Sequence, residues 1–100
     1  MRLSATQTRL ILECVRAQFG ADAQVLLFGS RLDDAARGGD VDLLVETAAE
    51  PTVRQRALAT MALEQALNLP VDIVAQQRGM PGSAFAQIAR AKAQLLEVAA

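Results

Sequence analysis

The segment Asp40–Glu46 alternates apolar and polar residues, and this pattern constrains the fold more than any other feature of the chain. Side chains of an extended strand point to opposite faces in turn, so its valines and one leucine share a face that would meet a core. Asp40 and Asp42 then share the opposite face, together with Leu44. Aspartate is disfavoured in strands. Two of them on one strand face therefore raise the question of a role beyond strand formation.

The remaining sequence predicts helices that alternate with two further short strands. Ser4 and Gln7 have the capping-box form at the start of an apolar pattern of helical period, and Gly20 suits the end of that helix. In chain order we expect a helix between Ser4 and Gly20, a strand over Gln24–Phe28, a short helix over Arg31–Ala36, a strand over Asp40–Glu46, a helix from Pro51 to Leu67, a strand over Val71–Ala75, and a helix after Ser83.

Each long helix carries apolar residues at helical spacing, which predicts the face that packs on the sheet. These positions are Leu10, Ile11, Cys14, Val15 and Phe19 in the first helix, Val53, Ala57, Leu58, Met61, Ala62 and Leu67 in the second, and Phe85, Ile88, Leu95 and Leu96 in the last.

Strands covered by helices define the fold class as α/β (α+β), with a small mixed sheet of about three to four strands flanked by helices. The connection through residues 29–39 is short for a parallel crossover, which normally takes a dozen or more residues. The first two strands should therefore be antiparallel. A chain of 100 residues suits one domain spanning residues 1–100.

Composition excludes several classes of function. A net charge of −1 and a pI of about 5.3 argue against a surface that coats DNA or RNA. The sequence has no histidine and one cysteine, Cys14, which excludes Ser–His and Cys–His nucleophile pairs and an internal disulfide. We find no apolar run long enough for a membrane span and no signal-peptide pattern, so we expect a cytoplasmic protein.

A third strand-borne acid, Asp72, alternates with Val71 and Ile73 and would join the first two if its strand lies beside theirs. Two carboxylates 4 Å apart repel by roughly 4 kcal/mol at an effective dielectric constant near 20. A hard divalent ion such as Mg²⁺ takes oxygen ligands and would neutralise such a cluster. The alternative is that these acids only line the polar face of an amphipathic strand.

Gly29, Ser30 and Arg31 follow the first predicted strand directly. Glycine permits a sharp turn and a close approach to a ligand, and serine is a good helix N-cap, where free N–H groups bind phosphate. An ordinary strand-to-helix turn is the alternative, with Arg31 paired to Asp33 or Asp34. The segment is not a P-loop, because no Lys-Ser/Thr follows the glycines.

Taken together, these motifs resemble those of the DNA polymerase β-like nucleotidyltransferase superfamily, and the length resembles its minimal members. The resemblance rests on "LLFGSR", "GDVDLLV" and "PVDIV", with "IARAKAQLLE" similar to the family's final helix. It implies the nucleotidyltransferase fold, which has the architecture of a polymerase β palm.

The resemblance also implies roles for individual residues. Asp40 and Asp42 would hold two Mg²⁺ ions, and Asp72 would complete this metal and catalytic site and help activate the attacking hydroxyl. Two ions in such a site can stabilise both the attacking and the leaving oxygens of an in-line displacement. The residues implied in binding the nucleotide's phosphates are Gly29, Ser30 and Arg31.

Minimal members of the family commonly pair with a small helical protein of the HEPN type, often as the antitoxin of a toxin–antitoxin pair. The resemblance therefore implies transfer of AMP from ATP to a hydroxyl of that partner. A binding module that neutralises its partner by contact alone, with a vestigial site, is the alternative from a different class. A homo-oligomer is compatible with either.

Overall fold

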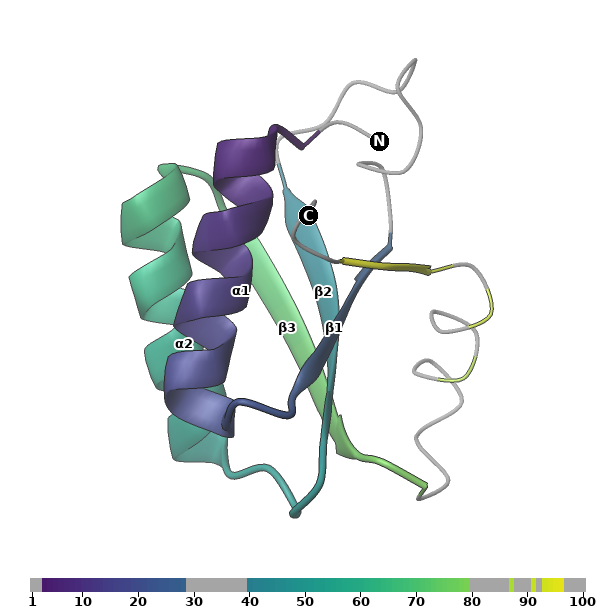
Figure 1. Cartoon of the computed structure of the whole chain (residues 1–100). Helices are drawn as coiled ribbons and strands as arrows, with labels where there is room; N and C mark the ends of the chain where they lie inside the picture. The colour runs from purple at the N-terminus through teal and green to yellow at the C-terminus, as the bar shows by residue number, and fades with distance from the viewer. Residues whose placement is uncertain (1–2, 29–39, 80–86, 88–90, 92, 97–100) are drawn as a thin grey trace.

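A computed structural model of the chain describes residues 3–28, 40–79, 87, 91 and 93–96. Its helices and strands follow one another as a helix, two strands, a helix and two strands (Figure 1). They are α1 (Ala5–Phe19), β1 (Gln24–Phe28), β2 (Val41–Thr47), α2 (Val53–Leu67), β3 (Val71–Gln77) and β4 (Gln94–Leu95).

The four strands form one mixed sheet in the order β3-β2-β1-β4. β1 and β2 are antiparallel, as their short connection predicts, whereas β2 and β3 are parallel and begin in register at Val41 and Val71. The predicted fold class is therefore confirmed. The parallel pair is joined by α2, which supplies the long crossover that parallel strands need.

Capping side chains fix where both helices begin. Ser4 accepts a hydrogen bond from the backbone N–H of Gln7, and the Gln7 side chain accepts one from Ser4 in return. Thr52 and Gln55 form the same reciprocal pair at the start of α2. Such pairs satisfy N–H groups that a helix leaves free in its first turn.

The helices end where the sequence indicates. α1 stops before Gly20, whose φ of 109° is costly for any residue with a Cβ. Asn68 ends α2 in the left-handed region, with φ 54° and ψ 41°, just ahead of Leu69 and Pro70. Asparagine tolerates this conformation better than most residues.

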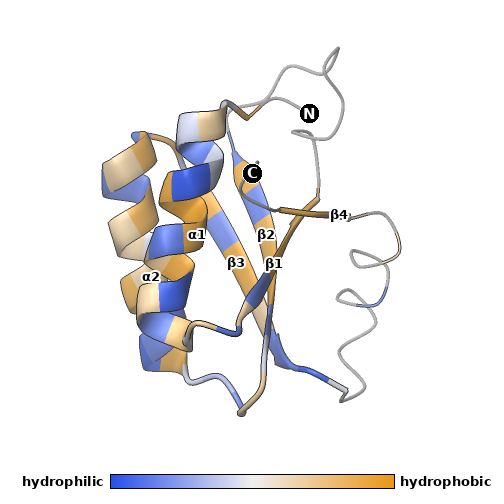
Figure 2. Ribbon diagram, in the orientation of Figure 1, coloured by the Kyte–Doolittle hydropathy of each residue, from blue (hydrophilic) through white to orange (hydrophobic). Residues whose placement is uncertain are grey.

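α1 and α2 lie side by side over one face of the sheet (Figure 1). Hydrophobic and hydrophilic residues alternate along β2 and β3 (Figure 2), so each strand sends alternate side chains into this helix-covered core. The core is continuous from the two helices to β1, β2 and β3, and it includes Leu96, which follows β4. Its buried members are Ile11, Leu12, Val15, Phe19, Ala23, Val25, Leu27, Val41, Leu43, Val45, Ala59, Leu63, Val71, Ile73 and Leu96.

The predicted apolar face of α2 was wrong for most of its residues, although Leu67 is partly buried and packs against the core. Its buried residues are Ala59 and Leu63, whereas Val53 and Met61 are 73% and 60% exposed. Leu58 is also exposed. Apolar residues occupy most of the circumference of this helix, so periodicity alone could not choose the face, and contact with α1 and β3 decided it.

The prediction that the last helix continues through Leu95 and Leu96 was also wrong. Gln94 and Leu95 form β4, which pairs with β1 through Leu26 and Leu27. In a strand, neighbouring side chains point to opposite faces. Leu96 is therefore buried as predicted, but Leu95 is exposed.

Some predicted features fall outside the described residues: the short helix over Arg31–Ala36, the cap at Ser83, and the core positions Phe85 and Ile88. Within the described part of the chain, neither helix combines the length and apolar character that crossing a membrane requires.

Candidate functional site

Asp42 and Asp72 are direct neighbours across the sheet. They are register partners in the parallel pairing of β2 with β3, and neighbouring strands lie roughly 4.8 Å apart. Their side chains share the sheet face that looks away from α1 and α2, because Val41, Leu43, Val71 and Ile73 on either side of them fill the helix-covered core. The strand that carries Asp72 thus lies beside the strand that carries Asp42, which is the condition under which Asp72 can join the other two acids.

Asp40 stands just before β2 and is exposed, whereas Asp42 is partly buried. Burial raises the pKa of Asp42 above its usual value, and the negative charges of Asp72 and then Asp40 raise it further. The apolar neighbours explain the burial: Phe28 is the register partner of Asp42 on β1, and Phe28 packs with Leu44 in a second apolar cluster. Asp72 and Asp40 are therefore both close enough to Asp42 to act on it electrostatically.

The donor set fits a hard cation in its chemistry, since all three groups are carboxylates and their mutual repulsion favours a positive ligand. The arrangement of these side chains does not by itself form the three-carboxylate metal site that the sequence predicts. Among the residues that the structure describes, no three Asp, Glu, Cys or His side chains converge on one point suited to a metal ion.

The predicted phosphate-binding residues Gly29, Ser30 and Arg31 lie outside the described residues. The described residue that precedes them, Phe28, ends β1 opposite Asp42. The chain thus leaves β1 at the level of the acids.

A comparison with known protein families identifies the family to which a chain with this sheet and these acids belongs. The family model of the nucleotidyltransferase domain matches residues 8–95, which include all but the first three residues of α1, the whole of α2, the four described strands and all three acids. The chain belongs to the nucleotidyltransferase domain family. No curated protein matches it. The mixed sheet and its two covering helices are consistent with the polymerase β-like fold of this family, as the sequence motifs predict.

At the opposite end of β2 and β3 in this nucleotidyltransferase domain, the polar pair consists of one acid and one amide, whereas Asp42 and Asp72 are both acids. Glu46 and Gln76 are register partners, and the Gln76 Nε2 donates a hydrogen bond of 3.0 Å to the Glu46 Oε2. Glu46 is buried, with 5% of its surface exposed. Between this pair and the acids lies the second apolar cluster, whose members are Leu26, Phe28, Leu44, Val74 and Ala93.

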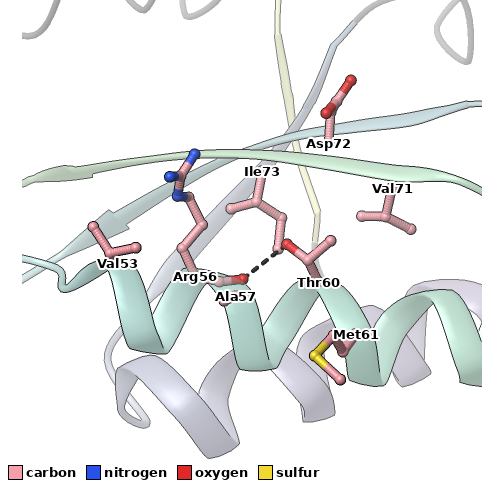
Figure 3. A pocket seen from close by; sticks show the side chains of 8 residues that line it. All are labelled: Val53, Arg56, Ala57, Thr60, Met61, Val71, Asp72 and Ile73. Atoms are coloured by element: carbon pink, nitrogen blue, oxygen red, sulfur yellow. Dashed lines mark hydrogen bonds between the residues drawn. The ribbon is translucent and has the colours of Figure 1, made fainter.

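A groove opens between α2 and the outer strand β3, and sequence reasoning missed it. It has a volume of about 340 Å³ and includes Asp72 in its wall (Figure 3). Val71 and Ile73 point from β3 toward α2 in Figure 3, whereas Asp72 points to the other side of the strand. The full lining is Val53, Arg56, Ala57, Thr60, Met61, Val71, Asp72 and Ile73.

Only the excess of apolar residues on α2 hinted at this groove in the sequence. Residues such as Val53 and Met61 had been assigned to the core, and their exposure appears only once α2 is oriented against the sheet. Phe28 was likewise predicted as a strand residue, but its position opposite Asp42 follows from the register of β1 with β2.

Proposed function

We propose that this nucleotidyltransferase domain transfers AMP from ATP to a hydroxyl group of a partner protein, in a reaction that depends on Mg²⁺. The observation that carries the proposal is the register pairing of Asp42 with Asp72 on one face of the sheet. Two unneutralised carboxylates on adjacent strands weaken a fold, and nothing in strand formation requires them. Within this family, such acids are explained by a cation and a phosphorylated substrate.

Asp40 and Asp42 would hold the Mg²⁺ ions, with Asp72 as the third carboxylate of the set. When bound, Mg²⁺ would neutralise the triphosphate and stabilise charge on the attacking and leaving oxygens. Gly29 and Ser30 would contact the terminal phosphates through backbone N–H groups and a hydroxyl, and Arg31 would add a positive charge.

In the proposed reaction, the acceptor hydroxyl oxygen bonds to the α-phosphorus of ATP while the bond from that phosphorus to the bridging oxygen breaks. Pyrophosphate leaves, and Asp72 accepts the hydroxyl proton and passes it to water. Asp72 suits this role because it is exposed, so that an acceptor can reach it, and because it neighbours Asp42. Positioned general bases of this kind typically contribute 10²–10⁴-fold to the rate.

The acceptor that we propose is a small helical protein of the HEPN type, with the chain acting as its antitoxin. This part rests on the family resemblance of the motifs.

Isothermal titration of ATP into the purified chain tests the nucleotide site, first with Mg²⁺ and then with EDTA. Binding that requires Mg²⁺ is the expected result. Incubation of the chain and its co-purified partner with α-labelled ATP then tests transfer, which should place label on the partner. Binding that is equally tight in EDTA would contradict the proposed role of the carboxylates.

The second candidate is neutralisation of the partner by contact alone. The exposed apolar surface of α2 favours it, because Val53, Leu58 and Met61 resemble residues of a docking surface more than those of a solvated helix. EDTA separates the two candidates: contact neutralisation would survive chelation, whereas neutralisation by nucleotidyl transfer would not.

A further inference from the structure

β3 is an outer strand of the sheet, and its hydrogen-bonding pattern defines which backbone groups face outward. Val41 donates its N–H to the carbonyl of Pro70, and Arg78 donates its N–H to the carbonyl of Thr47. These bonds fix the phase of the parallel ladder, in which even-numbered residues of β3 bond to β2. The odd-numbered residues therefore direct their N–H and C=O groups away from the sheet. Among the described strands, β3 pairs with β2 alone.

One of these outward N–H groups already has a partner. The N–H of Val71 donates a hydrogen bond of 3.1 Å to the Oε2 of Glu64 on α2. Within the part of the chain that the structure describes, no backbone group pairs with the outward groups of Ile73, Ala75 and Gln77, which follow one another along the edge with the spacing that an added strand would match.

An apolar groove runs beneath this row. Below Val71 and Ile73 it forms the hollow of Figure 3, and below Ala75 it continues as a second hollow of about 180 Å³. Val53 and Arg56 line both hollows. The open strand edge and the exposed apolar side of α2 thus belong to one continuous surface.

We propose that this surface binds a second copy of the chain, with the two β3 strands antiparallel and the two-fold axis at Ala75. In this register, Ala75 pairs with its own copy and Ile73 pairs with Gln77 of the second copy. Each of the three outward-facing residues then has a hydrogen-bonding partner. Val71, whose N–H Glu64 already occupies, falls outside the paired segment.

The side chains that this register brings together are complementary. Ala75 and Val53 line the same hollow, so the axis that relates the two Ala75 residues also brings the two exposed Val53 side chains together. Arg56 lines the hollow beside Ile73, whereas the segment that contains Glu50 lies at the Gln77 end of β3, where the Gln77 side chain donates a hydrogen bond to the carbonyl of Ala48. Because this register pairs Ile73 with Gln77 of the second copy, it brings each Arg56 toward Glu50 of the other copy. Opposite charges at these positions favour a second copy over an unrelated apolar segment.

The same register adds a residue to the candidate site. Asp72 and Arg78 lie three residues to either side of Ala75, which places Asp72 opposite Arg78 of the second copy. Cross-strand pairs of opposite charge stabilise a sheet. Within its own chain, the Arg78 guanidinium donates a hydrogen bond of 2.6 Å to the carbonyl oxygen of Asp22. In the dimer it would exchange this neutral acceptor for the carboxylate of Asp72, whose own-chain neighbour is another acid, Asp42.

Sedimentation equilibrium of the purified chain over a concentration series tests the proposal, without nucleotide or partner. A monomer–dimer equilibrium is expected. Val53→Glu should raise its dissociation constant at least about ten-fold, because it places two like charges at the axis. Ala66→Glu adds the same charge to an exposed position of α2 that lines neither hollow, and it should leave the dissociation constant unchanged.

Cysteine cross-linking tests the register itself. In Ala75→Cys, the two cysteines would face each other in a hydrogen-bonded antiparallel pair, whose Cα separation of about 5.5 Å allows a disulfide. Mild oxidation should link residue 75 to residue 75, identified by mass spectrometry. Gln77→Cys is the matched control, because its partner is residue 73 of the second copy and it should not link to itself.

Three results would overturn the proposal: a chain that stays monomeric throughout the series, a dimer equally sensitive to Val53→Glu and Ala66→Glu, or a dimer in which Gln77→Cys cross-links to itself and Ala75→Cys does not. None of them bears on the nucleotide site, since ATP binding by a monomer would leave the proposed function intact.

Discussion

The Gln76 side-chain amide donates a hydrogen bond of 3.0 Å to the carboxylate of Glu46, while four residues earlier on the same two strands Asp42 stands opposite Asp72. The two pairs occupy equivalent positions in one ladder. At one end a buried acid has a neutral donor as its neighbour, and at the other a partly buried acid has a second acid. The first arrangement gives a buried carboxylate a hydrogen-bond donor, whereas the second sets two carboxylates side by side, which strand formation does not explain.

Asp42→Asn should abolish Mg²⁺-dependent binding of ATP and leave the fold intact. The substitution removes a carboxylate ligand, and it relieves repulsion from Asp72 and Asp40. Calorimetric titration measures the first effect and thermal unfolding the second, where the melting temperature should stay the same or rise by a few degrees at most. Glu13→Gln is the control, because it removes an exposed carboxylate from α1 without touching the site. A variant that binds Mg²⁺-ATP as tightly as the unmodified chain would refute the assignment.

The raised pKa of Asp42 gives stability a defined pH dependence. The folded chain holds this proton more tightly than the unfolded chain, so the group's contribution to stability falls as pH rises from about 3.8 through the folded pKa. Asp42→Asn should therefore gain stability relative to the unmodified chain over that window and keep the gain above it. Urea unfolding at several pH values measures the difference in unfolding free energy between the two proteins. Asp42→Asn would instead lose stability as pH rises if a cation in its surroundings stabilised the Asp42 carboxylate.

Mg²⁺ should bind more tightly as pH rises through the same window, because the proton on Asp42 competes with the metal. Titration of Mg²⁺ into the ATP-free chain on either side of the folded pKa gives the affinities. A metal affinity independent of pH would place the cation elsewhere.

Asp72→Asn should reduce turnover far more than binding. If Asp72 accepts the hydroxyl proton, its loss should lower kcat for transfer by about 100-fold or more, while the Kd for Mg²⁺-ATP changes only a few-fold. Label transfer from ATP and calorimetry supply the two values. Equal losses in both would instead make Asp72 mainly a metal ligand.

The corrected orientation of α2 predicts a contrast in stability between two of its residues. Leu63→Ala should cost about 2–5 kcal/mol of unfolding free energy, because Leu63 is fully buried and the substitution leaves a cavity. Met61→Ala should change stability by less than about 0.5 kcal/mol, because Met61 is largely exposed. Denaturant unfolding of both variants measures the two losses. A larger loss of stability for Met61→Ala than for Leu63→Ala would mean that the face predicted from periodicity is the buried one.

The strands β1, β2 and β3 and the face that carries the acids were predictable because their signals are local. Alternation in Asp40–Glu46 placed Asp42 on the right face, and β1 spans the residues expected from sequence, Gln24–Phe28. The capping box at Ser4 located the start of α1, whereas Pro51, expected in the first turn of α2, precedes the N-cap Thr52, and α2 begins at Val53. The short connection after Phe28 correctly indicated antiparallel pairing.

Features that depend on distant parts of the chain were not predictable in this way. The local pattern around Gln94 and Leu95 predicts a helix, but these residues form a strand because they pair with the edge of β1. The buried face of α2 is set by its neighbours, since its apolar residues surround the helix. The roles of Gly29, Ser30 and Arg31 stay predictions, as do the metal ions and the partner.

The register that pairs Asp42 with Asp72 also limits how this sequence can vary. A single residue inserted or deleted within the first positions of β3 would turn Asp72 toward the helices and send Val71 or Ile73 to the opposite face, because side chains alternate along a strand. Changes of length should therefore be tolerated in the turn at Ala48–Glu50 and rejected between Pro70 and Ile73. Among natural variants of this chain, the spacing from Asp72 to the strand's first residue should be as constant as the aspartate itself.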